Sequence, residues 1–181
     1  QLNLEFVKSA QVVGVIDEVK VKSRQIAYEV LIEIAMNLYG IESALVGFAN
    51  EEVNKVLGNI TYALTTWEDI EREEGSSIGR YVVERYLGEM RKVFSGGGMV
   101  AKMGDEIRQK LQKGLVSEFV KAAGSVVQDN VYYVMAKRRA CKFGNDYAIG
   151  LRWLRHLGYV QVSTNPVLAA RAYDDDPELM E

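Results

Sequence analysis

Two adjacent polar residues near the C-terminus have the types and the position that could do chemistry. A short β-prone run at residues 159–163 stops at Thr164 and Asn165, and Pro166 behind them cannot continue a central strand. In α/β sheets and barrels, a parallel strand that ends in this way presents polar side chains at the C-terminal edge, where ligands bind. The hydroxyl and the amide are therefore candidates for hydrogen-bonding a polar substrate.

The same residues also suit a plain turn. Asparagine tolerates unusual backbone conformations, and Pro166 pre-sets φ for the first turn of a helix that follows. The sequence leaves both interpretations open, one structural and one functional.

One βαβ unit at the end of the chain would position these residues. Residues 131–135 are β-branched and aromatic, which is typical of a strand. Asn145 or Asp146 can cap a helix that Gly158 ends, and the strand at 159–163 follows. Strand, helix and strand in this order predict a right-handed crossover between two parallel strands. Because a two-stranded parallel sheet is rarely stable alone, we expect further strands or a covering element.

The preceding part of the chain, residues 1–126, is predicted to be a helical domain. No proline interrupts residues 1–165, and apolar residues recur with helical spacing. Residues 10–22 suit a strand or a buried helix, and we favour the helix. The clearer helices are expected to begin at four polar residues, Ser23, Asn50, Ser77 and Asp105. The helix from Ser23 is predicted to bury one apolar face, made by Ile26, Ala27, Val30, Leu31, Ile34, Ala35 and Leu38. The helix from Asp105 is predicted to bury Ile107, Leu111, Leu115, Phe119 and Val120.

The segment VSTNPVL, residues 162–168, resembles the second-strand motif of the transaldolase family, class I aldolases built on a (β/α)8 barrel. The resemblance covers roughly residues 130–181, and its sharp motif is Thr-Asn-Pro. It implies that residues 127–181 form the start of such a barrel. The expected fold is thus mainly α, with an N-terminal helical bundle and one βαβ unit that opens an incomplete (β/α)8 barrel.

The resemblance also implies a function, Schiff-base aldol chemistry on phosphorylated sugars. The active-site asparagine of the family corresponds to Asn165, with Thr164 as a neighbouring polar contact. The proton-transferring aspartate of the family follows the first strand, but here Ala136 and Lys137 follow residues 131–135, and Asp146 is the aspartate at a plausible spacing. A barrel needs about 250 residues, and the family's Schiff-base lysine lies on a later strand. We therefore expect an N-terminal fragment, inactive by itself, that needs no cofactor and no metal.

Composition limits the other functions. A net charge of −3 argues against a chain devoted to nucleic acid, and no apolar run approaches the ~20 residues of a membrane span. A single cysteine, Cys141, excludes an internal disulfide and fits a reducing compartment, so we predict a cytoplasmic protein. Residues 137–155 nevertheless carry a local charge of +5, which could hold a sugar phosphate, a nucleic acid or an acidic partner. The same charges could instead belong to an ordinary amphipathic helix and pair with acids of the helical region, and the sequence leaves this open.

The alternative to an enzyme fragment is a helical module for protein–protein interaction or dimerisation, without catalysis. It would form a homo-oligomer or dock a partner through the helical domain, and apolar surface left over after folding would favour it.

Overall fold

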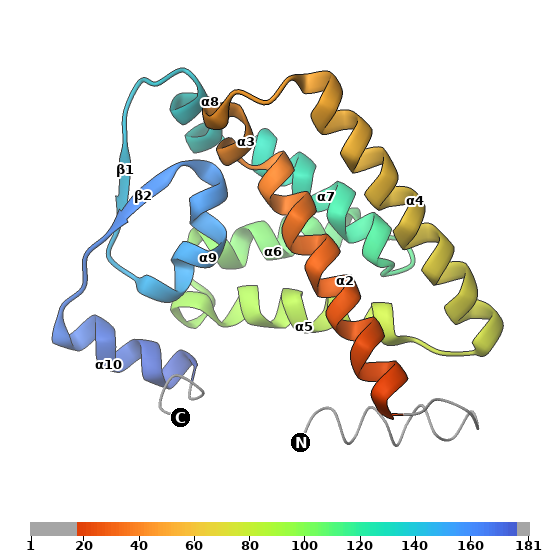
Figure 1. Ribbon diagram of the computed structural model, residues 1–181. Helices are drawn as coiled ribbons and strands as arrows, with labels where there is room; N and C mark the ends of the chain where they lie inside the picture. Colours follow the sequence, from red (N-terminus) through yellow and green to blue (C-terminus); the bar gives the residue numbers. More distant parts are fainter. Residues whose placement is uncertain (1–17, 177–181) are drawn as a thin grey trace.

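The computed structural model describes residues 18–176 and shows a mainly helical protein with one small parallel sheet (Figure 1). The longer helices are α2 (Glu18–Tyr39), α4 (Asn50–Glu74), α5 (Ile78–Lys92), α6 (Met99–Lys110) and α7 (Val116–Gln128). The shorter ones are α3 (Ile41–Val46), α8 (Val131–Lys137), α9 (Leu151–Leu154) and α10 (Pro166–Asp175), with the 3-10 turns η1 (Val93–Gly96), η2 (Ala148–Gly150) and η3 (Arg155–Leu157). The strands are β1 (Phe143–Asn145) and β2 (Tyr159–Val162).

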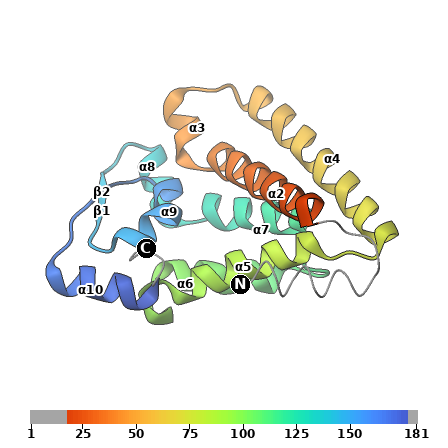
Figure 2. The same cartoon turned by 60° about the horizontal axis from the view of Figure 1, so that its bottom comes forward.

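The helices α5, α6 and α7 pack against one another, and α2 crosses α5 and α7. Helix α4 lies along α2 and α7 on one side of the molecule, and the sheet and α10 lie on the opposite side (Figure 2). One hydrophobic core runs through both parts of the chain, because Tyr86 of α5 packs edge-on against Phe119 of α7 and against Trp153 of α9. The division between residues 126 and 127 stays a prediction. Among the residues described, no helix is long and apolar enough to cross a bilayer.

Helix α2 buries only part of the face that its apolar spacing predicts. Ala35 is buried and Leu31 and Leu38 pack against the core, as predicted. Ile26, Val30 and Ile34, however, are 51%, 49% and 41% exposed, and Tyr28 and Ile32 are buried in their place. The reason is that α2 is apolar on two sides, and the side that carries the large Tyr28 ring fills the space beside Trp67. Ser23 lies inside α2 and does not cap it.

The sequence predicts a helix that Asn50 caps and Gly75 ends. Helix α4 has these bounds, although Ala49 and not Asn50 is its N-cap residue, and α5 begins directly after Ser77 as predicted. Gly75, with φ of 67°, ends α4 in the left-handed conformation that glycine adopts without strain. Ser77 is the N-cap residue of α5, but its side chain makes no capping hydrogen bond, and the N–H of Gly79 donates instead to Glu71 of α4 at 3.0 Å. A carboxylate from a neighbouring helix thus replaces the local side-chain cap.

The helix predicted from Asp105 to Val120 is two helices. Asp105 lies inside α6, the chain leaves the helix at Leu111, and α7 starts at Val116. Glu118 holds the turn between them, since its carboxylate accepts the backbone N–H groups of residues 112–114 at 2.9–3.1 Å. The apolar spacing continues across this turn, so it gives no sign of the break.

Residues 131–135 form most of helix α8, and the strand prediction there is wrong. The Asn130 side chain caps α8 by accepting the N–H of Tyr132 at 3.0 Å. Tyr133 and Ala136, three residues apart, are buried, whereas Val131 is exposed. Burial of one helical face has overridden the β-propensity of this run.

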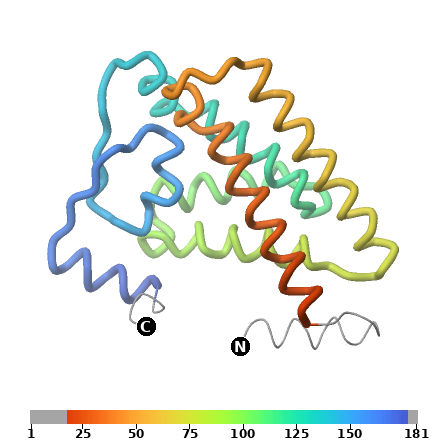
Figure 3. Tube along the Cα trace, viewed as in Figure 1, coloured from red at the N-terminus to blue at the C-terminus, as the bar shows by residue number. Residues whose placement is uncertain are grey.

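The sheet pairs β1 with β2 in parallel, with Phe143 opposite Tyr159 and Asn145 opposite Val162. The second strand is where the sequence predicts it, and the first begins twelve residues later than predicted. The connection is not one helix but the succession η2, α9 and η3, and Gly158 ends it with φ of 97°. Figure 3 follows this crossover along the backbone. The further strands of a barrel stay a prediction.

Candidate functional site

The sheet brings together the ends of its two strands. Asp146 follows β1 directly, and Ser163 follows β2. The Ser163 hydroxyl donates to Asp146 Oδ1 at 2.9 Å, so Asp146 lies beside the start of the Ser163–Asn165 segment. An aspartate thus does follow the first strand of the pair, although that strand is not the predicted one.

Asn165 has a structural task at this edge. Its Oδ1 accepts the N–H of Leu168 at 3.0 Å, which caps α10, and Pro166 occupies the first turn of that helix. The Thr164 hydroxyl makes a long contact of 3.4 Å to the Asn165 carbonyl oxygen. Thr164, Asn165 and Asp146 are all exposed. The segment is therefore a turn that leads into a helix, which is one of the two interpretations that the sequence left open, and the cap by Asn165 was not predicted. Catalysis by these residues stays a prediction.

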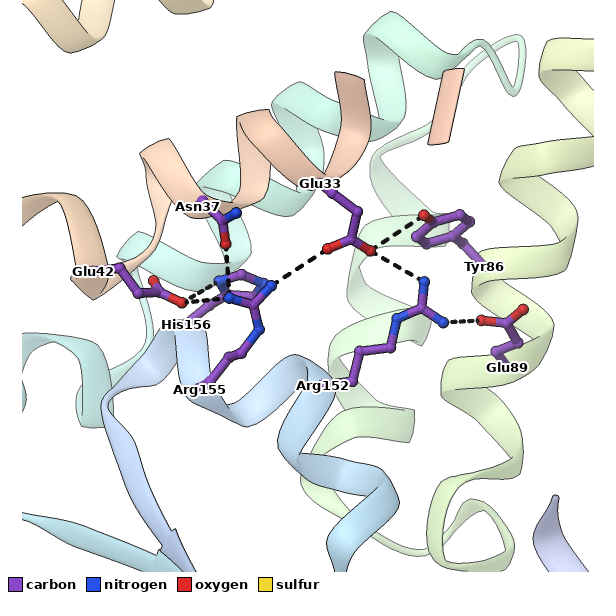
Figure 4. Close-up of polar contacts among 8 residues, drawn as sticks. All are labelled: Glu33, Asn37, Glu42, Tyr86, Glu89, Arg152, Arg155 and His156. Atoms are coloured by element: carbon purple, nitrogen blue, oxygen red, sulfur yellow. Dashed lines mark hydrogen bonds and ion pairs between the residues drawn. The ribbon is translucent and has the colours of Figure 1, made fainter. Parts of the chain in front are cut away.

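A second polar cluster joins the C-terminal segment to the helical bundle, and we call it the clasp (Figure 4). Its side chains come from α2, α3, α5, α9 and η3. They are Glu33, Asn37, Glu42, Tyr86, Glu89, Arg152, Arg155 and His156.

Arg152 is the bridge between two helices. Its guanidinium donates to Glu33 of α2 at 3.1 Å and to Glu89 of α5 at 2.8 Å. It also lies 5.0 Å from the ring centroid of Tyr86 and 5.1 Å from that of Trp153, within cation–π range. Burial alone would lower the pKa of Arg152, but the hydrogen bond that it donates to Glu33 and the charge of Glu89 outweigh burial and raise the pKa.

Arg155, one turn further on, continues the clasp. It donates to Asn37 at 2.7 Å, to Glu42 at 3.1 Å and to the second oxygen of Glu33 at 3.4 Å. Glu33 also accepts the Tyr86 hydroxyl at 3.3 Å. Each arginine thus reaches two carboxylates on different elements, and Glu33 is shared between them.

His156 is the buried member of the clasp, and it contacts Glu42. It is 2% exposed, and its Nδ1 lies 2.9 Å from Glu42 Oε1. Burial would raise the pKa of Glu42, but the contact with His156 and the charge of Arg155 lower it below its usual value. The other oxygen, Glu42 Oε2, is buried without a hydrogen-bond partner and lies against Gly40. It faces backbone and not open space, so it is badly placed to take a proton from a substrate.

The geometry of the clasp therefore suits structural stabilisation and not acid–base catalysis. A histidine, a tyrosine and three carboxylates in one cluster resemble an acid–base site, but the carboxylates are already bound by arginine or histidine. Two parts of the chain far apart in sequence are held together by this network.

The sequence left open whether Arg152 and Arg155 bind an outside partner or pair with acids of the helical region, and the structure shows the pairing. The sequence does not show which carboxylates bind them, because these lie on helices much earlier in the chain. It also gave no sign that His156 belongs to the cluster.

The remaining basic residues of that patch have no such partners. Lys137, Arg138, Arg139 and Lys142 are exposed, and none forms an ion pair with a carboxylate in residues 18–176. The positive charge of the patch is thus divided between two paired arginines at the clasp and four unpaired cations between the end of α8 and β1.

Comparison with protein-family models, with curated proteins and with solved structures found no match to this chain.

Proposed function

We propose that this chain is a helical protein–protein interaction module that self-associates through the outward face of α2. The observation that carries the proposal is the line of Ile26, Val30 and Ile34, spaced by four residues and each 41–51% exposed. Single exposed apolar residues are ordinary, but a straight apolar stripe on a helix suits a partner surface.

The lack of exposed charged residues on this face supports self-association. From Ser23 to Asn37, the exposed positions of α2 are occupied by Ser23, Ile26, Val30, Ile34 and Asn37, none of which is charged, and the exposed Lys22 lies one turn before Ile26. Two copies of the face can therefore approach without like-charge repulsion, as an isologous dimer requires. Complete burial of each half-exposed side chain would contribute on the order of 1 kcal/mol.

Sedimentation of the native gene product over a range of concentrations tests the proposal. We expect a dimer for the natural protein, a monomer for Val30→Glu, and a dimer for the control Tyr62→Glu, since Tyr62 is an exposed apolar residue on α4. A natural protein that stays monomeric at high micromolar concentration would overturn the proposal, and so would a Val30→Glu variant that dimerises normally.

A second candidate is the N-terminal part of a transaldolase-like enzyme acting on phosphorylated sugars. The observation that favours it is that Asp146 and Asn165 follow consecutive parallel strands at one sheet edge, the placement that the family resemblance implies. Borohydride trapping of the native gene product with sugar phosphates tests it. A trapped lysine adduct would support this candidate, and its absence with active controls would end it.

A further inference from the structure

The loop that leads into β1 carries a dense positive charge. Lys137, Arg138, Arg139 and Lys142 lie within six residues, and the sequence contains no acidic residue from Asn130 to Asn145. We call residues 137–142 the basic loop. In a chain of net charge −3, an exposed group of four unpaired cations is complementary to an acidic partner.

The strand that follows the basic loop has an open edge. The sheet of the described residues holds only β1 and β2, so each is an edge strand. Besides β1, β2 contacts α9 and η3, whereas the other edge of β1 pairs with no strand among the described residues (Figure 1). An open edge presents backbone N–H and C=O groups that can pair with another strand.

We propose that β1 accepts an extended acidic peptide of a partner protein as a third strand, with the basic loop binding its carboxylates. Strand addition supplies backbone hydrogen bonds, and the adjacent charges select the peptide. A nucleic acid would use the cations but not the strand edge. This surface lies apart from the outward face of α2, so the inference does not depend on self-association.

Fluorescence anisotropy with a labelled peptide of alternating glutamate and valine tests the proposal. The matched probe is the same peptide with N-methyl groups on every second amide, which keeps the charge but removes the donors of one edge. We expect the N-methylated peptide to bind at least ~10-fold more weakly, a loss of about 1.4 kcal/mol. Binding of the unmodified peptide should also weaken as salt is added.

The variant Arg138→Glu/Lys142→Glu should weaken peptide binding by ~10-fold or more. The control Lys110→Glu/Lys121→Glu makes the same change in net charge at two exposed lysines of α6 and α7 and should leave binding unchanged. Circular dichroism of both variants verifies that they fold.

Three results would overturn the proposal. Equal binding of the N-methylated peptide would show charge attraction without strand addition. Tighter binding of a single-stranded RNA than of the peptide would show a nucleic-acid surface. No binding by the natural protein would show that the edge is closed, as a later strand of a barrel would close it.

Discussion

His156 Nδ1 and Glu42 Oε1 lie 2.9 Å apart because the residue between α2 and α3 has no side chain. A Cβ on Gly40 would collide with Glu42 Oε2 and would lie 2.9 Å from both His156 Nδ1 and the carbonyl oxygen of Met36. The backbone of Gly40 has φ of −65°, which any residue adopts. Space, and not conformational freedom, therefore requires glycine here.

Gly40→Ala should lower the free energy of unfolding by about 1–3 kcal/mol, because the methyl group displaces Glu42 and presses on backbone. The matched control is Gly58→Ala on α4, where an added Cβ meets no atom within 4 Å. It should stabilise the protein by ~0.5–1 kcal/mol through helix propensity. Urea denaturation of both variants measures the difference, and a Gly40→Ala variant as stable as the natural protein would contradict the packing described.

Arg152→Met should destabilise the protein by about 1–2 kcal/mol, since it removes two ion pairs and the contact with two aromatic rings. Arg108→Met is the comparison, because Arg108 pairs with Glu84 on the surface through two hydrogen bonds of 2.8 and 3.1 Å. That change should cost less than ~1 kcal/mol. If the two substitutions had equal effects on urea unfolding, the clasp would be an ordinary surface contact.

Acid should weaken the α6–α7 turn through Glu118. Burial alone would raise the pKa of Glu118, but the N–H groups that it accepts lower the pKa below its usual value. A carboxyl group whose pKa is lower in the folded state stabilises the fold above the unfolded pKa of about 4.3 and loses that contribution as the pH falls through the folded pKa. Urea unfolding between about pH 5 and pH 3 should therefore show a smaller loss of stability for Glu118→Gln than for the natural protein. Glu106→Gln, at an exposed position of α6, should keep the natural pH dependence.

Asn165→Ala should fray the first turn of α10 and cost about 1 kcal/mol locally, whereas Asn165→Asp should keep the cap. The rate of hydrogen exchange at the Leu168 amide measures the strength of the cap directly, because this N–H donates to Asn165 Oδ1. Faster exchange in the alanine variant alone would establish the structural role. Unchanged exchange in both variants would show that the cap does not hold in solution and would leave the asparagine free for another role.

Local chemistry explains why parts of the fold were predictable. The bounds of α4 follow from helical apolar spacing between Asn50 and Trp67 and from the stop signal at Gly75, and the second strand follows from a β-prone run between Gly158 and Pro166. The turn at Thr164–Pro166 was one of two interpretations that the local sequence allowed. In each case the signal lies within a few residues of the feature.

The wrong predictions share a different cause. In α2 two apolar faces competed, and the local spacing could not tell which one the core would take. Residues 131–135 have strand propensity, but burial of Tyr133 and Ala136 on one side makes them helical. The break before α7 is held by Glu118, whose role as an acceptor for residues 112–114 has no apolar pattern.

The sequence by itself determined a mainly helical chain, the ends of α4, the second strand and the local positive charge of residues 137–155. Only the tertiary structure decided which face of α2 stays exposed, which strand pairs with β2, and that Arg152 and Arg155 are bound by carboxylates of α2, α3 and α5. The physical reason is the range of the interactions: propensity and capping act between near neighbours in sequence, whereas burial and ion pairing depend on surfaces that meet only after the chain has folded.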